Sequence, residues 1–249
     1  VAPAHYAKLY PVDKIEPLME KPGDRDDIPS VGLHDRPHQR ELTLAKRKEI
    51  IQAYYASISL MDACVGRLLD ALDDLKLAEN TIVVFFSDHG YHLGHHGLWQ
   101  KSDLFEGSVR VPMIISVPGT KQGGKKSASL VELIDLYPTL ADLCGLAKPG
   151  HLKGKSIVPL LDDPSKTVRD AAFTVTRARG KMPRGLKGPK PLGRTIRTDR
   201  YRYTEWGKDG EFGVELYDYQ SDPGEYTNLA KRRGNEVLVN LMRAKLHAT

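Results

Sequence analysis

The densest group of titratable side chains is the stretch SDHGYHLGHHGLWQK, residues 87–101. It holds four histidines, an aspartate and a lysine, and it directly follows the apolar run TIVVFF. Asp88 and His89 leave the end of a predicted strand together, so both can face one cation, and Gly90 lets the backbone turn sharply after them. Lys101 would bring an ammonium group to an anion bound at that cation. The stretch therefore predicts a cation-assisted site for an anionic group, and an Asp-His-Gly turn without a ligand is the structural alternative.

A zinc cage is the competing interpretation of the same stretch, because histidine-rich tracts bind metals. Its ligands would be His92, His95 and His96. The stretch offers no thiolate partner, and Gly94 and Gly97 interrupt any helical register. We therefore favour the cation-and-anion site.

Bulk composition limits what this site can belong to. A chain of 249 residues, 40% of them hydrophobic, is long enough for one large domain or one domain with a smaller addition. No apolar run approaches the roughly 20 residues that span a bilayer, so we expect no membrane span. The two cysteines, Cys64 and Cys144, lie far apart within apolar helical patterns. We expect two buried free thiols rather than a disulfide.

Positive charge is concentrated between Arg177 and Arg202, where ten lysines and arginines accompany a single acid, Asp199. A solvated loop rich in glycine and proline is one interpretation, and attraction of a polyanionic substrate is the other. No aromatic residues are interleaved with the basic ones before Tyr201. We therefore expect no nucleic-acid partner.

Hydrophobic periodicity predicts the elements that must position the opening stretch. Residues 41–77 show apolar residues at helical spacing and predict one long amphipathic helix. TIVVFFS and VPMIISVPG are typical of strands buried on both faces of a parallel sheet. SLVELIDLYPTLADLCG predicts a following helix with Ser127 or Ser129 as its N-cap, in which Pro138 starts a second helix or kinks the first. This order predicts an α/β sheet sandwiched by helices.

The pattern changes after about residue 165. AAFTVTRA, GRTIRTDRYRYTEW and GVELYDY alternate apolar and polar residues, as half-exposed antiparallel strands do. NEVLVNLMRAKLHA predicts a closing helix. We therefore predict an α/β domain over residues 1–164 and a small α+β subdomain, an antiparallel sheet plus helix, over residues 165–249.

Several separate segments resemble one family. YYASISLMDACVGRLLDAL, the strand ending in Ser-Asp-His-Gly, the following Gly-x-His-Gly and then Lys101 resemble the second half of a formylglycine-dependent sulfatase of the alkaline-phosphatase superfamily. RTIRTDRYRYTEW and ELYDYQSDPGEYTNLA resemble the family's C-terminal subdomain. The likeness covers nearly the whole chain from about residue 41 and is strongest to the iduronate-2-sulfatase branch. It implies an alkaline-phosphatase-like fold.

The resemblance also implies roles for residues. Asp88 and His89 would be ligands of a divalent cation, usually Ca²⁺ in the family, with Zn²⁺ less favoured. Lys101 would be the catalytic residue that contacts the sulfate. Substrate contacts are expected from residues around these three, namely Tyr91, His92, His96 and Trp99. In the C-terminal subdomain, Arg197 is expected to meet a carboxylate or a second sulfate of the substrate.

One part of the family's active site has no counterpart in these residues. The nucleophile is a formylglycine made within Cys/Ser-x-Pro-x-Arg, and neither Cys64, Cys144 nor any serine provides that motif. We therefore expect the formylglycine in an N-terminal portion, supplied by another chain or segment, and expect this chain alone to be incomplete and inactive. His34 and His38 are expected to be loop residues. The expected substrate is a sulfated saccharide, and the expected location is that of an exported bacterial enzyme, periplasmic or extracellular, rather than lysosomal.

Two further functions stay open. A zinc phosphodiesterase of the same superfamily can also end a strand in Asp-His-Gly, and would use two zinc ions and a Ser or Thr nucleophile. The Gly-x-His-Gly continuation and Lys101 favour the sulfatase. A catalytically inactive fragment that binds polyanions through residues 177–202 is the other alternative, and it predicts salt-sensitive binding.

Overall fold

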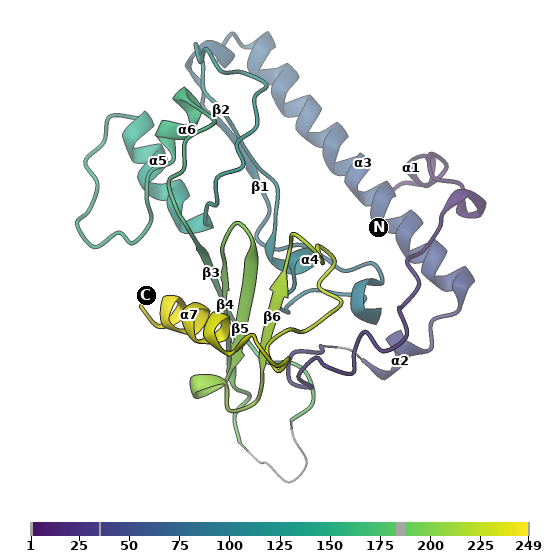
Figure 1. The fold of residues 1–249 in the computed structure, drawn as a ribbon. Helices are drawn as coiled ribbons and strands as arrows, with labels where there is room; N and C mark the ends of the chain where they lie inside the picture. The colour runs from purple at the N-terminus through teal and green to yellow at the C-terminus, as the bar shows by residue number, and fades with distance from the viewer. Residues whose placement is uncertain (1, 35, 183–187, 249) are drawn as a thin grey trace.

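The structure, a computed structural model, describes residues 2–34, 36–182 and 188–248 (Figure 1). Helices and strands alternate through the first two thirds of the chain, and strands dominate the last third. The elements are α1 (Ala4–Ala7), α2 (Pro37–Arg40), α3 (Leu44–Asp74), β1 (Val83–Phe86), α4 (Glu106–Val109), β2 (Met113–Ser116), α5 (Leu136–Leu143), α6 (Val158–Asp162), β3 (Ala172–Arg177), β4 (Leu192–Arg197), β5 (Tyr201–Trp206), β6 (Val214–Asp218) and α7 (Glu236–His247). Short 3₁₀ turns lie at Val12–Lys14, Ala78–Asn80, His95–Gly97, Leu133–Asp135 and Lys208–Gly210.

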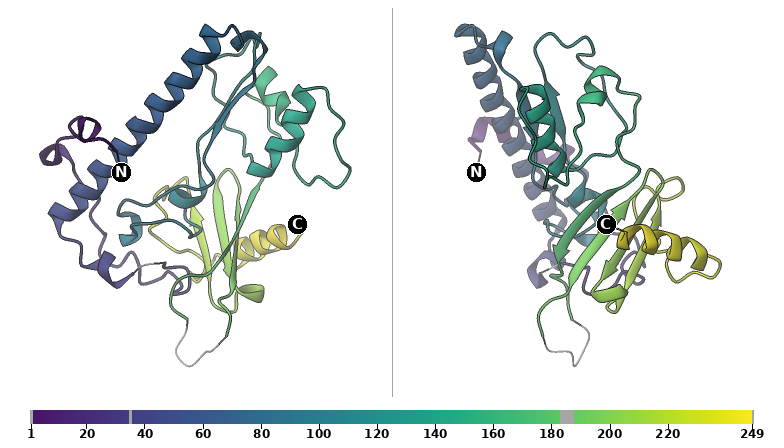
Figure 2. Two further views of the ribbon diagram at one scale, coloured as in Figure 1. Left: turned by 180° about the vertical axis from the view of Figure 1, so that it is seen from behind. Right: turned by 90° about the vertical axis from the view of Figure 1, so that its left-hand side faces the viewer.

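The long helix predicted over residues 41–77 is confirmed as α3. Thr43 caps it, because its hydroxyl accepts a hydrogen bond from the backbone N–H of Lys46 at 3.2 Å. Of its 31 residues only Ile51 and Ala56 are buried. Figures 1 and 2 show α3 at the margin of the molecule, with α1 beside it.

The two predicted strands are confirmed, but their predicted surroundings are wrong. β1 and β2 pair antiparallel, with Val83 opposite Ser116 and Phe86 opposite Met113. Phe86 is 48% exposed, so the strands are not buried on both faces. A run of β-branched and aromatic residues specifies a strand, whereas the direction of its partner depends on distant sequence. In both face-on views the pair lies between α3 and the helices α5 and α6 (Figure 2).

The helix predicted after the second strand begins later than expected. Neither Ser127 nor Ser129 caps it, and the first turn starts at Leu133 and continues into α5. The side chain of Asp135 instead accepts a hydrogen bond from the backbone N–H of Glu132, at 2.9 Å. Pro138 lies in the first turn of α5, where its missing N–H costs no helical hydrogen bond.

The antiparallel strands and closing helix predicted after residue 165 are confirmed, but β5 and β6 are not half-exposed as predicted, because every residue after the first in each strand is buried. Strands β3, β4, β5 and β6 form a sheet in that order, every pair antiparallel. One face packs against α7, whose Met242 and Leu246 join Ile196, Tyr203 and Leu216 in the core (Figure 1). The boundary at residue 164 stays a prediction, and the sheet itself begins at Ala172.

Two further apolar clusters join this C-terminal sheet to the stretch 87–101 and the residues just after it. In the first, Leu98 and Phe105 pack with Ile28 and with Tyr217 of β6. In the second, Leu104 packs with Val31, Ala178 and Trp206. The stretch that follows β1 therefore rests on the C-terminal sheet rather than on β1 and β2 alone.

The prediction that both cysteines are buried is wrong. Cys64 and Cys144 are free thiols, as expected, but both are exposed. Cys64 lies on the face of α3 that no other described element buries, and Cys144 lies at the C-terminal end of α5, so apolar sequence neighbours did not imply burial. In the residues that the structure describes, no helix combines the length and apolar composition needed to cross a bilayer.

Candidate active site

The structure brings Asp88, His89 and Lys101 together at the end of β1. His89 Nδ1 lies 2.8 Å from the carbonyl oxygen of Gly90, and since a carbonyl only accepts, Nδ1 carries the proton. Nε2 therefore carries a lone pair rather than a proton, and this lone pair accepts a hydrogen bond from Lys101 Nζ at 2.5 Å. Asp88 Oδ2 is 3.5 Å from the same ring nitrogen. A carboxylate, an acceptor imidazole nitrogen and an ammonium group thus converge on one place.

This group suits a cation only as part of a larger ligand set. The side chain of Asp88 is 81% exposed and that of His89 is 34% exposed, so both can reach a ligand. Ca²⁺ takes six to eight oxygen ligands, and imidazole suits zinc better. Among the described residues, no three His, Cys, Asp or Glu side chains lie close enough to hold a metal ion by themselves. Further ligands would have to come from outside this group.

The turn after the strand depends on a close backbone approach. The N–H of Gly90 donates to the carbonyl of Ser108 at 2.8 Å. A Cβ at position 90 would lie 2.1 Å from the carbonyl oxygen of Gly107. Only glycine fits, so the sequence places Asp88 and His89 on a turn with a fixed course.

Tyr91 and Trp99 lie across the loop from each other. The Tyr91 hydroxyl donates to the Trp99 carbonyl at 3.1 Å, and the Tyr91 ring stacks on Tyr54 of α3. Tyr91 is 37% exposed, whereas Trp99 is 3% exposed and packs with Ile15 and Ile51. The substrate contacts predicted for Tyr91 and Trp99 stay predictions.

His92 and His96 are both buried and both hydrogen-bonded to carboxylates. A carboxylate only accepts, so His92 Nε2 donates to Asp103 Oδ1 at 3.0 Å and His96 Nδ1 donates to Asp24 Oδ1 at 3.1 Å. The His96 ring stacks on Phe105 with centroids 4.2 Å apart. Burial opposes charge on this imidazole, but the hydrogen bond and charge of Asp24 outweigh it and raise the pKa of His96. The predicted substrate contacts of these two histidines also stay predictions.

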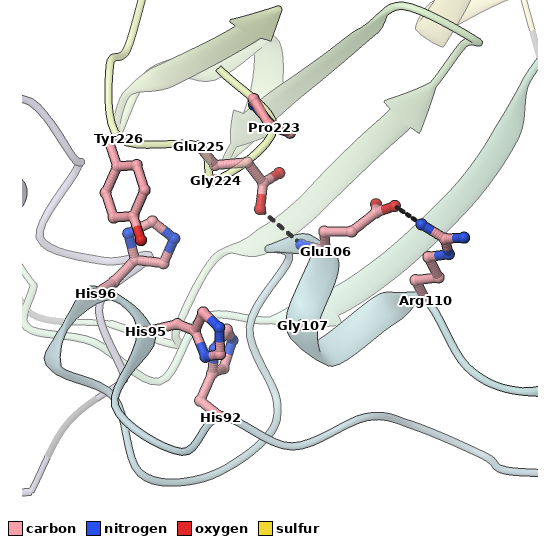
Figure 3. Close-up of a pocket in the computed structure, with 10 residues that line it drawn as sticks. All are labelled: His92, His95, His96, Glu106, Gly107, Arg110, Pro223, Gly224, Glu225 and Tyr226. Carbon is pink, nitrogen blue, oxygen red and sulfur yellow. Dashed lines mark hydrogen bonds and ion pairs between the residues drawn. The ribbon is translucent and has the colours of Figure 1, made fainter. Parts of the chain in front are cut away.

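A pocket of about 400 Å³ lies between this loop and the turn Pro223–Tyr226 (Figure 3). His92, His95 and His96 line one side, and Glu106, Gly107 and Arg110 of α4 line another. The backbone N–H of Glu106 donates to Glu225 at 2.7 Å, which joins α4 to the turn. Burial and the neighbouring imidazoles lower the pKa of His95.

Arg197 lies in a buried charge network behind this pocket. Its guanidinium stacks on Tyr219 at 3.7 Å, and its Nε lies 3.7 Å from Glu106. Arg202 also pairs with Glu106, and its Nε lies 2.8 Å from Glu225. The Arg197 side chain is only 17% exposed, so its predicted substrate contact, which stays a prediction, would use a small opening.

Much of the basic charge counted in the sequence is compensated. Residues 183–187 of that stretch lie outside the described residues. In the described part, Arg194 pairs with Glu205, Arg200 with Asp218, and Arg202 as above. Since these carboxylates lie on β5, β6, α4 and the turn at Glu225, the excess seen along the sequence does not carry over directly into a surface patch.

Sequence reasoning missed several residues of the site. His34, expected in a loop and found in one, donates from Nδ1 to the carbonyl of Lys101 at 3.1 Å. His38 was expected in a loop but lies in α2. Asp24 and Asp103 carried no motif that marked them, and Asp24 is 72 positions from its partner His96. Only a three-dimensional structure pairs them.

Comparison with known proteins shows which family this chain belongs to. The sequence profile of the Sulfatase family matches residues 3–146, more than half of the chain, and the profile described as N-sulphoglucosamine sulphohydrolase, C-terminal, matches residues 94–249. A sulfatase from Formosa agariphila is 33% identical over 253 residues, which cover 99% of this chain and 46% of that protein. Iduronate 2-sulfatase of Homo sapiens is 32% identical over 302 residues, which cover 91% of this chain and 55% of that protein.

A solved structure agrees. The phosphonate monoester hydrolase of Agrobacterium radiobacter matches with a TM-score of 0.72 and 30% identity, over 84% of this chain and 42% of that one. The fold has the alkaline-phosphatase-like architecture, as predicted. The chain belongs to the Sulfatase family, so the predicted resemblance is confirmed. It spans about half the length of the relatives it matches.

Proposed function

We propose that this chain supplies the cation-binding and sulfate-facing half of an active site that hydrolyses a sulfate ester on a saccharide. The convergence of Asp88, His89 and Lys101 at the end of β1 carries this proposal. Membership in the Sulfatase family gives the reaction class. The likeness to iduronate 2-sulfatase supports a sulfated uronate sugar as the substrate class.

Each of the three residues has a defined task in this proposal. Asp88 and the unprotonated Nε2 of His89 would hold Ca²⁺ together with ligands from outside this chain's group, with Zn²⁺ the less favoured metal. The cation would take the Nε2 lone pair that accepts from Lys101 Nζ in this structure. When bound, the cation supplies positive charge that polarises a sulfate oxygen. Lys101 places its ammonium against the sulfate and offsets negative charge that develops as the ester bond breaks. Tyr91, Trp99 and Arg197 are proposed to contact the sugar.

The nucleophile is proposed to come from a polypeptide, or a segment of the same one, that corresponds to the first half of the relatives. The chain covers only 46% and 55% of two relatives, which leaves about half of each without a counterpart here. The exposed apolar side chains of α3 offer that half a surface, among them Ile58, Met61, Leu68 and Leu69. Without it, we propose, the chain does not turn over substrate. An exported location is part of the same proposal.

The test begins with the protein purified from its native source together with any polypeptide that accompanies it. Intact mass identifies a formylglycine-bearing partner, and a panel of sulfated disaccharides and aryl sulfates measures hydrolysis. Lys101→Ala should lower kcat by 10²–10³-fold, and Asp88→Asn should abolish the dependence on added Ca²⁺. Lys166→Ala, a change on the turn after α6, is the matched control. Full activity in Lys101→Ala would refute the assignment.

A phosphorus ester or phosphonate is the second candidate substrate, because the matching solved structure is a phosphonate monoester hydrolase. The same preparations distinguish the two. Hydrolysis of aryl phosphonates or phosphodiesters in preference to sulfates, with two zinc ions per molecule, would replace the sulfatase assignment. Salt-sensitive heparin binding that survives Asp88→Asn, with no hydrolysis of any ester, would favour the polyanion-binding alternative.

A further inference from the structure

Lys101 reaches His89 because the chain between them closes into a tight loop. The N–H of His92 donates to the carbonyl of Gln100 at 2.9 Å, and the N–H of Gly94 donates to the carbonyl of Leu98 at 2.9 Å. Lys101 is the next residue after this closure. Its side chain is long and flexible, so the backbone closure alone does not fix the direction from which the ammonium approaches.

A buried side-chain pair closes the loop a second time, on the far side of Lys101. His92 Nε2 donates to Asp103 Oδ1 at 3.0 Å, and their side chains are 1% and 0% exposed. The same carboxylate oxygen accepts from the N–H of Phe105 at 3.1 Å. Lys101 is therefore held between a backbone bond at position 100 and a carboxylate anchored at position 103.

The neighbouring helix α4 packs closely against the His92 imidazole. Gly107 of α4 lies against the ring, and a Cβ there would come 2.7 Å from His92 Cε1 (Figure 3). The ring is therefore held by its bond to Asp103 and by its close contact with Gly107. The pair costs stability, however, because His92 Nδ1 and Asp103 Oδ2 have no hydrogen-bond partner among the described residues.

A well-packed apolar pair could close the same loop without that cost, whereas the His92–Asp103 hydrogen bond also orients both side chains. We infer that His92 and Asp103 are positioning residues, which fix the loop so that the Lys101 ammonium is held beside His89 for the incoming anion. The purpose of this placement, which is to receive an anion, rests on the proposed function. It assigns His92 a task different from the substrate contact that the family resemblance implied.

We call the His92–Asp103 pair the clamp. Nuclear magnetic resonance of the isotope-labelled 249-residue chain tests whether this clamp positions Lys101. Wild-type protein should show a slowly exchanging ring N–H proton on His92 and a nuclear Overhauser contact between the Lys101 side chain and the His89 ring. His92→Phe keeps the aromatic bulk but cannot donate, and it should lose that contact. His92→Gln keeps a side-chain N–H donor and should restore it. Met242→Ala shortens a buried side chain of α7 that packs on the C-terminal sheet. It perturbs stability far from the loop and should keep the contact.

Binding of inorganic sulfate in the presence of Ca²⁺, measured on this chain together with the polypeptide that completes the site, connects the clamp to function. His92→Phe should weaken sulfate binding about tenfold, the size of effect typical when the support of a functional group is removed. An unchanged contact and unchanged affinity in His92→Phe would overturn the inference. If the completed wild-type enzyme binds no sulfate but the contact depends on His92 as described, the clamp stands and the proposed function fails.

Discussion

Replacing Glu215 by glutamine should change how the stability of the protein depends on pH. Glu215 lies on β6 and is 3% exposed. Its carboxylate accepts hydrogen bonds from Trp206 Nε1 at 2.6 Å and from the Tyr217 hydroxyl at 2.8 Å. Both rings belong to the clusters that support the loop.

Burial raises the pKa of Glu215 from its ordinary value of 4.5 to about 7, because loss of water disfavours the charged form more than the two hydrogen bonds favour it. The folded state therefore holds a proton that the unfolded state releases at lower pH. Stability from this group is full below about pH 4.5 and is lost as the pH rises to about 7. At about 1.4 kcal/mol per pKa unit, the loss amounts to about 3 kcal/mol.

Glutamine mimics the protonated carboxyl at every pH and keeps an acceptor for Trp206. The difference in free energy of unfolding, Glu215→Gln minus wild type, should therefore rise by about 3 kcal/mol between pH 4.5 and 7 and stay level above that. Urea unfolding followed by tryptophan fluorescence at half-unit pH steps measures it. Glu79→Gln, an exposed change beside β1, is the control and should give a flat difference. A flat difference for Glu215→Gln as well would refute the reasoning.

Three shorter predictions concern the supports of the site. Arg202→Met leaves buried carboxylates without their cation and should lower the free energy of unfolding by about 3–5 kcal/mol in urea titrations. Gly90→Ala should lower the free energy of unfolding by about 1–3 kcal/mol in the same assay, because the added Cβ would lie 2.1 Å from a backbone oxygen. Gly66→Ala in α3, where the added Cβ meets nothing within 4 Å, should raise it by about 0.5–1 kcal/mol. Equal effects of the two substitutions would contradict the packing argument. Asp24→Asn should cost more stability at pH 5.5 than at pH 8, because Asp24 raises the pKa of His96 and its stabilisation is lost as the pH rises through that value. Thermal unfolding at the two pH values checks this, and equal losses would count against it.

Local sequence predicted the elements of this chain better than their surroundings. The helical spacing of apolar residues in α3 and the apolar–polar alternation in the sequence of β3 to β6 are local patterns. The sequence therefore predicted these elements at the positions where the structure has them. The partner of β1 is not a local property, so the predicted parallel pairing failed. The burial of Cys64 failed for the same reason, because an apolar stripe on a helix shows which face is apolar but not whether anything covers it.

In the candidate site, too, the residues marked by local sequence were predicted and those brought in from distant sequence were not. Asp88, His89 and Lys101 lie within fourteen positions of one another, so one motif found all three. Their supports lie far away along the chain: Asp24 bonds to His96 across 72 positions, and Arg202 reaches Glu106 across 96. A buried aspartate in a Pro- and Asp-rich segment has no sequence signature that distinguishes it from a solvated one.

The contact between Asp27 and Asn228 sets when the site can form during synthesis. The backbone N–H of Asn228 donates to Asp27 at 2.9 Å across 201 positions, and this bond closes the segment that holds Asp24 and Ile28 against the loop. At roughly 5–20 residues per second, a ribosome needs on the order of 10–40 s to make the intervening chain. The His-rich loop emerges in the first half of that interval and waits, with its apolar side chains uncovered, for the C-terminal sheet. A nascent chain stalled before β6 should therefore bind holdase chaperones through residues 98–105, and a released chain should not.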